Sequence, residues 1–410
     1  MSQTGAAGSL ERGFTVKKTI VGALALIAPV LGAAAAPASN DYDWRTNWPT
    51  HYVFADGTDI GLSLKYQYDL DRFSHDEGTY EDAQTNRRKE FGFFVRNKGV
   101  YDGTVVFDFQ TKTWLDVFFR LQSKALFDRD IGAFRVGFMK TPVGFEGNTS
   151  TGSTSFMETS LPMQAIYANR RLGFDWALTR KAYLVQLGYY KGGNLQGDLD
   201  GRMVAARAAW TPMNSPGNVL HLGGSYSREN PDGSTDGRGR YNPPSVRLRA
   251  LPEAGLASRR LIDSGALSVA EHVERRGLEG LWIRGPWSMQ GEYLSARVKL
   301  ENKPAYDAHG WYAFGSWVVT GESRTYSAGN IGDVVPKGPW GALEFVLRYS
   351  TLDLDDGPTL GGTEHDWTLG ANWYLTKYLK LQANYVRATS DRRDLRIDPH
   401  IFQMRAQVMF

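Results

Sequence analysis

The sequence predicts an all-β protein: a transmembrane antiparallel β-barrel of about 16 strands. Three observations support this fold class. After residue 40, apolar and polar residues alternate almost everywhere, with the period of two that a β-strand has. The alternating segments are long, near the roughly 9–11 residues that a tilted transmembrane strand needs. Their polar faces carry Arg348, Lys380 and Arg405, which a packed soluble core would not accept unpaired.

The alternation is clearest near the C-terminus. In 402–410, Phe402, Met404 and Phe410 share an apolar face, and Gln403, Arg405 and Gln407 lie on the other. The segments 367–375 and 379–385 show the same division. Aromatic residues stand at segment ends, as in the interfacial girdles of membrane barrels.

Sixteen such segments follow one another along the chain, and an even number suits an outer-membrane barrel. The expected strands are 59–69, 87–97, 102–111, 115–122, 132–138, 173–179, 182–190, 201–211, 219–228, 273–284, 286–299, 307–320, 341–352, 364–376, 378–390 and 398–410.

The predicted sheet must close on itself, because an open sheet edge has no hydrogen-bond partners in lipid. Sixteen strands leave a water-filled channel rather than a packed interior. A helical membrane protein is excluded, since past residue 38 there is no apolar run of the roughly 18 residues that a spanning helix needs.

The first residues have the pattern of a secretory signal peptide. Lys17 and Lys18 precede an apolar stretch at 19–36, and alanines follow at the expected cleavage sites. We therefore expect a signal peptide at 1–38 and a single barrel at 39–410. A membrane anchor is the alternative, which Pro29 and the run of four alanines disfavour.

Two connections are too long for turns, 140–172 and 229–271. Long loops without secondary structure are usually functional. In a wide barrel they are expected to fold into the lumen and narrow it.

Positive charge is concentrated in the middle of the chain. The formal net charge is only +3, yet residues 170–284 hold 17 Lys and Arg against 11 Asp and Glu. This distribution suggests a localised anion site. The chain has no Cys, which excludes disulfides and thiolate metal sites.

Strand alternation identifies the basic residues that would face the lumen. The predicted inward set on the strands is Arg88, Arg120, Lys124, Arg135 and Arg207. Arg87 has the wrong parity and is expected at a strand end, where the chain can bend. The alternative for each is an ordinary scattered charge in a wide lumen.

Four segments resemble the phosphate-selective porins, a family that includes the polyphosphate- and pyrophosphate-selective members. They are NRRKEFG (86–92), RVGFMKTPVGFEGNTSTGSTSFME (135–158), LEGLWIRGPWSMQGEYL (278–294) and HDWTLGANWYLTKYLKLQANYVRATSD (365–391). The resemblance implies a trimeric, 16-stranded outer-membrane channel of a Gram-negative bacterium, with arginines and lysines along an anion path.

The resemblance also places the pair Arg247 and Arg249 in a loop that folds into the pore. Arg259 and Arg260 follow in the same loop, and the alternative is a solvated surface loop. The sequence departs from the family at 147–156, which carries no Lys or Arg where members often place lysines. Other arginines would then carry the selectivity.

The expected function is a passive channel for phosphate, pyrophosphate or polyphosphate, embedded in outer-membrane lipid as a homotrimer. Cofactor, metal and nucleic acid are not expected, because the histidines are scattered and no phosphate-binding loop is present. A general or sugar-type porin with weak anion preference remains the alternative. An outer-membrane lipase is a third, and no catalytic Ser and His can be identified for it.

Overall fold

The computed structural model describes residues 48, 50–191, 195, 201–393 and 395–410, which all belong to one compact unit, Asp41–Phe410. The predicted signal peptide at 1–38 lies outside the described residues. None of the described helices is long and apolar enough to cross a membrane.

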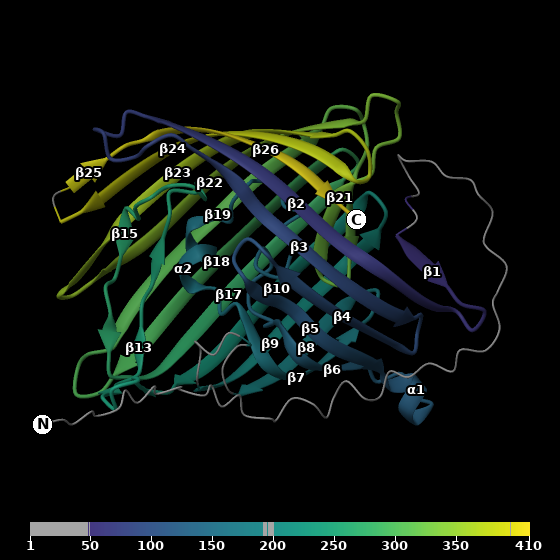
Figure 1. Cartoon of the computed structure of the whole chain (residues 1–410), viewed down its shortest axis with the longest axis horizontal. Coiled ribbons are helices and arrows are strands. Elements are labelled where there is room, and N and C mark those ends of the chain that lie inside the picture. Colours follow the sequence, from purple (N-terminus) through teal and green to yellow (C-terminus); the bar gives the residue numbers. More distant parts are fainter. Residues whose placement is uncertain (1–47, 49, 192–194, 196–200, 394) are drawn as a thin grey trace, which may run out of the picture. The chain divides into compact units, whose positions relative to one another are not determined.

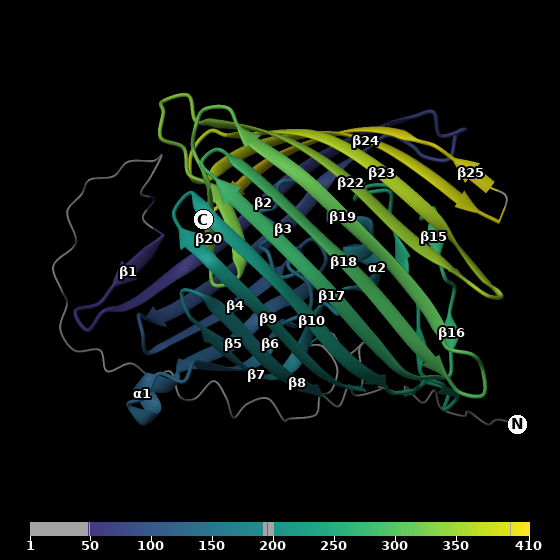
Figure 2. The same cartoon turned by 180° about the vertical axis from the view of Figure 1, so that it is seen from behind.

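The described residues form a closed antiparallel barrel (Figures 1 and 2). Its strands are β2 (Thr58–Ser74), β3 (Ala83–Asn97), β4 (Tyr101–Asp108), β5 (Thr113–Gln122), β6 (Ala133–Lys140), β7 (Arg170–Thr179), β8 (Tyr183–Lys191), β9 (Gly201–Ser215), β10 (Asn218–Pro231), β17 (Ala270–Arg284), β18 (Trp287–Leu300), β19 (Tyr306–Val318), β22 (Ala342–Asp356), β23 (Thr359–Tyr374), β24 (Leu379–Arg392) and β26 (His400–Met409). The barrel closes where β2 pairs with both β3 and β26. Each expected strand matches one of these, so the predicted fold class is confirmed.

The remaining elements are short. They are β1 (His51–Val53), α1 (Ser123–Phe127), α2 (Leu161–Ile166), β11 (Ser234–Thr235), β12 (Tyr241–Asn242), β13 (Ser245–Val246), β14 (Arg249–Ala250), β15 (Ile262–Asp263), β16 (Leu267–Ser268), β20 (Arg324–Ser327), β21 (Asn330–Val334) and β25 (Leu395–Ile397).

The alternation along each strand separates an apolar outside from a polar inside. On β22, Phe345 and Leu347 are 44% and 48% exposed on the outer face, whereas Glu344 and Arg348 are buried on the inner face. Lipid accepts the outer side chains, and the antiparallel ladders pair the backbone groups that lipid cannot solvate. Charged groups are therefore confined to the inside or to the ends of the strands.

Connections differ in length at the two ends of the barrel. One end, which carries β13, β15 and β25 at the left of Figure 1, has the long connections after β6 and β10. The opposite end has mostly short turns, such as the two residues between β17 and β18. Outer-membrane barrels have long extracellular loops and short periplasmic turns, so the first end is the extracellular one.

Two connections from the extracellular end pack inside the barrel. We name residues 141–169 the inner segment and residues 232–269 the long loop. Helix α2 of the inner segment packs against β18, β19 and β22, and its Leu161 and Ile166 are fully buried. The long loop adds Leu248 and Ile262 to the same apolar cluster. This apolar cluster thus lies between the two loops and the wall of β17, β18, β19 and β22.

A third insertion, which the sequence did not predict, comes from the periplasmic end. Residues 319–341 connect β19 to β22 and contain the hairpin β20–β21. The Tyr326 hydroxyl lies 2.7 Å from the His221 ring, and the Gly329 carbonyl accepts a hydrogen bond from Arg207 at 2.8 Å. These contacts hold the hairpin against the inner wall of β9 and β10.

Candidate functional site

The inner segment is attached to the wall through Glu158. Its carboxylate accepts two hydrogen bonds from Arg87, both 3.1 Å long, and one from Arg405, also 3.1 Å long. Burial alone would raise the pKa of Glu158, but Arg87, Arg405 and Arg88 hold it at about 2. The carboxylate is therefore charged under all physiological conditions, and it fixes the segment to β3 and β26.

The contact of Arg87 with Glu158 corrects its predicted placement. Arg87 lies inside β3 and not at its end, at a bulge where Gln67 pairs with Arg88 and Tyr68 pairs with Asn86. A bulge inserts one residue without a partner and turns its side chain. Arg87 and Arg88 therefore both reach the lumen, which strict alternation forbids.

A second attachment lies on β22. The Arg348 guanidinium is 3.2 Å from the Glu146 carboxylate of the inner segment and 2.6 Å from the Glu253 carboxylate of the long loop. It also donates a hydrogen bond to the Glu158 carbonyl at 3.0 Å. One fully buried arginine thus joins both loops to the wall.

The third attachment comes from the hairpin β20–β21. Arg324 donates hydrogen bonds to the Ser155 hydroxyl at 2.6 Å and to the Ser153 carbonyl, and pairs with Glu344 at 3.0 Å. Glu344 also accepts hydrogen bonds from Asn372 and Tyr374. The inner segment is therefore held from the wall and from the periplasmic hairpin.

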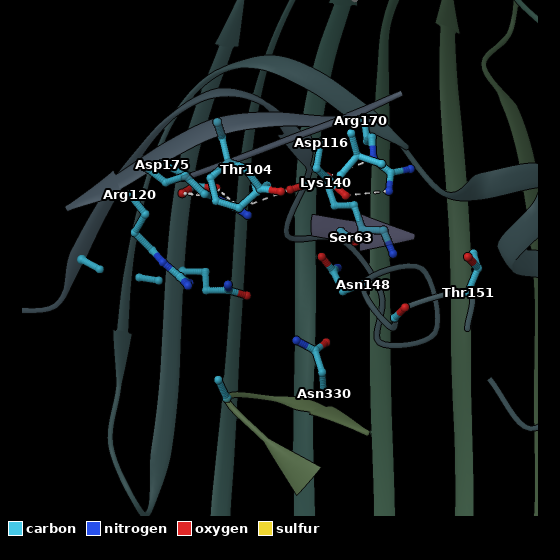
Figure 3. Close-up of a pocket in the computed structure, with 18 of the residues that line it drawn as sticks. Ser63, Thr104, Asp116, Arg120, Lys140, Asn148, Thr151, Arg170, Asp175 and Asn330 are labelled. Atoms are coloured by element: carbon cyan, nitrogen blue, oxygen red, sulfur yellow. Dashed lines mark hydrogen bonds and ion pairs between the residues drawn. The ribbon is translucent and has the colours of Figure 1, made fainter. Parts of the chain in front are cut away.

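A cavity of about 440 Å³ lies between the inner segment and the wall of β2 to β9; we name it the wall cavity (Figure 3). In Figure 3, Asp116, Arg170 and Lys140 group on the wall, Thr151 lies on the inner segment, and Asn330 lies on the hairpin. Its cationic lining residues are Lys65, Arg120, Arg135, Lys140, Arg170 and Arg207. Its acidic lining residues are Glu90, Asp116 and Asp175.

Ion pairs fix most of these cations in place. The Arg170 guanidinium donates two hydrogen bonds of 3.0 Å to Asp116, and the Lys65 ammonium lies 2.7 Å from Glu90. Arg135 pairs with Asp175 in the same way. The wall therefore presents rigid cationic groups, with twice as many cations as carboxylates in the lining.

Lys140 differs from the other cations of the wall cavity. Its ammonium donates a hydrogen bond of 2.6 Å to the Thr149 carbonyl. Within the described ranges, no carboxylate lies at ion-pair distance from it. Lys140 is thus a cation of the wall cavity that no described carboxylate holds.

A second cavity, of about 380 Å³, lies between the inner segment and the long loop; we name it the loop cavity. Its charged lining residues are Arg87, Arg88, Arg247, Arg249, Arg260 and Glu158. Burial and the neighbouring Arg249 lower the pKa of Arg260, as expected where like charges are close. Thr151 lines both cavities, so they meet at the inner segment.

The predicted residues divide into three groups. Those that line a cavity are Arg87, Arg88, Arg120, Arg135, Arg207, Arg247, Arg249 and Arg260. Lys124 was placed in the lumen wrongly, because β5 ends at Gln122 and the exposed Lys124 lies in α1, outside both cavities. Arg259 is exposed, and it too lines neither cavity. That these arginines bind anions stays a prediction.

Three further cations of the wall cavity were not predicted from the sequence: Lys65, Lys140 and Arg170. Lys65 alternates with Leu64 and Tyr66, so the same parity argument would have identified it. Lys140 shares the parity of the apolar Phe138, and only its position at the end of β6 brings it to the cavity. No sequence signal marks it.

Comparison with known proteins then decides the family. A model of the family described as phosphate-selective porin O and P matches residues 60–410. The chain belongs to this family. It is therefore a porin of the outer membrane of a Gram-negative bacterium and not an enzyme.

Two curated relatives share part of this sequence. Porin O of Pseudomonas aeruginosa is 31% identical over 212 residues, which cover 45% of this chain and 47% of the relative. An uncharacterized protein of Caulobacter vibrioides is 28% identical over 260 residues, 57% of this chain and 50% of the relative. The matched part thus spans about half the length of these relatives.

Solved structures share the fold at low identity. OmpT of Vibrio cholerae superposes with a TM-score of 0.56 at 11% identity, over 87% of this porin and 99% of OmpT. An anion-selective porin from Comamonas acidovorans gives a TM-score of 0.53 at 12% identity, over 86% of this chain and 100% of that one. These likenesses concern the barrel alone.

Proposed function

We propose that this porin is a passive channel for phosphate-type anions: inorganic phosphate, pyrophosphate or short polyphosphate. The observation that carries the proposal is the pair of cavities that meet at Thr151. Together they are lined by eleven cationic side chains and four carboxylates. An anion that crosses the inner segment passes from five arginines of the loop cavity to six cations of the wall cavity.

Arginine suits such a path for chemical reasons. A guanidinium is permanently charged, weakly hydrated and matches two phosphate oxygens with its planar fork. A hydrogen bond to a charged group contributes about 1.5–3 kcal/mol, so several acting at once would trap the ion. Carboxylates such as Asp116 and Asp175 pair with the arginines and so keep the affinity of each site for the anion moderate. Conduction needs sites that bind an ion and also release it.

A general or sugar-type porin is the competing proposal. Sugar selectivity needs aromatic rings along the path, on which the sugar can stack. The only ring among the lining residues of the two cavities is that of Phe118. Trp287, Trp311 and Trp367 are all exposed on the outer surface. These tryptophans thus face the membrane rather than the pore, which favours the anion channel.

We further propose that residues 1–38 are a signal peptide and that three copies assemble in outer-membrane lipid. A trimer form of Vibrio cholerae OmpT has the same fold, with a TM-score of 0.52, which supports the assembly by analogy. Chemical cross-linking of the detergent-solubilised porin would test it. A cross-linked species of three chains is expected, and a monomer at every cross-linker concentration would contradict the proposal.

Planar bilayer recordings test the anion path. We expect reversal potentials that favour chloride over potassium, and block of the chloride current by millimolar phosphate. The double variant Arg249→Gln/Arg260→Gln removes two loop-cavity charges and should weaken phosphate block about tenfold or more. Arg259→Gln, in the same loop but outside both cavities, is the matched control. Cation preference, or block by an oligosaccharide and not by phosphate, would overturn the proposal.

A further inference from the structure

A basic patch lies on the outer face of the barrel, away from the pore. It occupies the extracellular ends of β10, β17, β18 and β19. Its members are Arg228, Arg276, Arg297 and Lys299, with the carboxylates of Glu274 and Asp307. These side chains follow the parity of the lipid-facing residues, since Arg276 alternates with Leu278, which is 66% exposed.

The patch lies at the outer edge of the apolar band. On β17, Arg276 and Arg284 both face outward and are eight positions apart. Eight residues extend about 26 Å along a strand, or about 20 Å across a membrane when the strand is tilted by about 40°. This approaches the roughly 25 Å of the apolar band of such barrels. Arg276 therefore emerges among the headgroups of the extracellular leaflet.

The carboxylates of the patch do not neutralise it. Glu274 lies 3.2 Å from Arg276 and 3.9 Å from Arg228, and Asp307 lies 3.7 Å from Arg297. Three arginines thus share two carboxylates, and Lys299 has no ion-pair partner in the described part of the chain. Arg276 and Arg297 remain 67% and 60% exposed at their side chains. Their guanidinium groups keep donors for an external anion.

An apolar groove of about 810 Å³ lies directly below the patch on the same strands. Its floor is a row of small residues that pair across neighbouring strands, Gly280, Gly291 and Ala313. A side chain added at Gly315, one step below this row, would meet nothing within 4 Å. Trp282 and Trp311 are among the residues that line the groove.

We infer that this surface binds a phosphorylated glycolipid of the extracellular leaflet, of the lipid A class. Phosphate groups on the sugar headgroup match the guanidinium donors of the patch, and an acyl chain fits the groove below them. Neither the basic patch nor the apolar groove alone specifies the ligand, because both features are common on the outer face of membrane barrels. Their stacking on the same strands at headgroup depth specifies an amphiphile with phosphate above and hydrocarbon below.

Native mass spectrometry of the full chain in detergent tests the inference. The probe is a hexa-acylated, bis-phosphorylated lipid A, titrated into delipidated porin. We expect the variant Arg276→Gln/Arg297→Gln/Lys299→Gln to weaken binding at least tenfold. Gly315→Leu, which fills the groove, should weaken it about threefold or more. Bilayer conductance and phosphate block should stay unchanged in both variants, since neither touches a pore cavity.

Two matched controls distinguish binding at this site from nonspecific binding to the outer surface of the barrel. Arg284→Gln removes an outward arginine from the same strand at the periplasmic end, and Ala208→Leu adds an outward leucine on β9. Both should bind lipid A as wild type does. The inference is overturned if these controls lose as much binding, if phosphatidylglycerol or a lipid A without phosphates binds as tightly, or if the triple variant changes the oligomeric state, because a second copy would then cover the patch.

Discussion

The Arg324 guanidinium donates a hydrogen bond of 2.6 Å to the hydroxyl of Ser155. The two residues are 169 positions apart, and they join the periplasmic hairpin to the tip of the inner segment. Because Arg324 and its partner Glu344 are fully buried, the inner segment cannot leave this position without exposing a charge pair. The inner segment is thus held in place by contacts from both ends of the barrel.

Replacing Arg324 should loosen the contacts of Arg324 with Ser155 and Glu344, which we name the clamp. Arg324→Gln leaves Glu344 buried without its ion pair, which costs about 3–5 kcal/mol for pairs of this kind. We expect larger and noisier single-channel conductance and earlier unfolding on heating, seen as a shift of the heat-modifiable band. Arg396→Gln, in a largely exposed pair with Asp398, should leave both unchanged. Unaltered conductance in Arg324→Gln would show that the hairpin does not hold the inner segment.

The contact of Glu158 with Arg87 and Arg405 should also depend on pH. Its pKa is held at about 2 in the folded protein, below the unfolded value of about 4.3. A depressed carboxylate pKa stabilises the folded state above the unfolded pKa, and this stabilisation is lost as the pH falls through about 4 to 2. Conductance at constant salt should therefore be steady from pH 8 to pH 5 with respect to this contact. The variant Glu158→Gln should show at pH 7 the loosened state that wild type reaches only near pH 2.

Lys140 should contribute strongly to phosphate block. Its ammonium has a carbonyl partner at 2.6 Å and no described carboxylate partner, so a phosphate could pair with it without displacing a carboxylate. Loss of one charge-assisted hydrogen bond of about 1.5 kcal/mol corresponds to about tenfold in affinity. Lys140→Gln should raise the phosphate concentration for half-block by about that factor. Lys124→Gln, on the exposed α1, should not alter it.

Close packing at Gly255 should make the long loop and the inner segment depend on each other for stability. A side chain at this position would approach the Glu158 carboxylate to 2.5 Å and the Arg87 guanidinium to 2.9 Å. Gly255→Ala should therefore displace the Arg87–Glu158 contact and destabilise the barrel by about 1–3 kcal/mol, measured by thermal unfolding. Gly237→Ala, in the same loop with open space around it, is the control. Equal stability of the two variants would contradict this mutual dependence.

The sequence by itself determined the barrel and the inward parity of Arg88, Arg120, Arg135 and Arg207. Alternation is a local property of a strand. Because one face of each strand meets lipid and the other meets water, every strand needs alternating apolar and polar residues. Parity failed wherever the chain leaves regular geometry. Arg87 reaches the lumen through a bulge, and Lys140 reaches the wall cavity from a strand end.

Only the tertiary structure decided which segments fill the lumen and which cations meet there. The hairpin β20–β21 reads as an ordinary long turn, and its role depends on contacts between Arg324, Ser155 and Glu344. Such contacts join residues that are distant in sequence, so no local pattern encodes them. The loop arginines 247, 249 and 260 line a cavity because buried ion pairs hold both loops inside the barrel. The ion-pair partners of such residues lie on other strands and loops, and they come together only when the sheet closes.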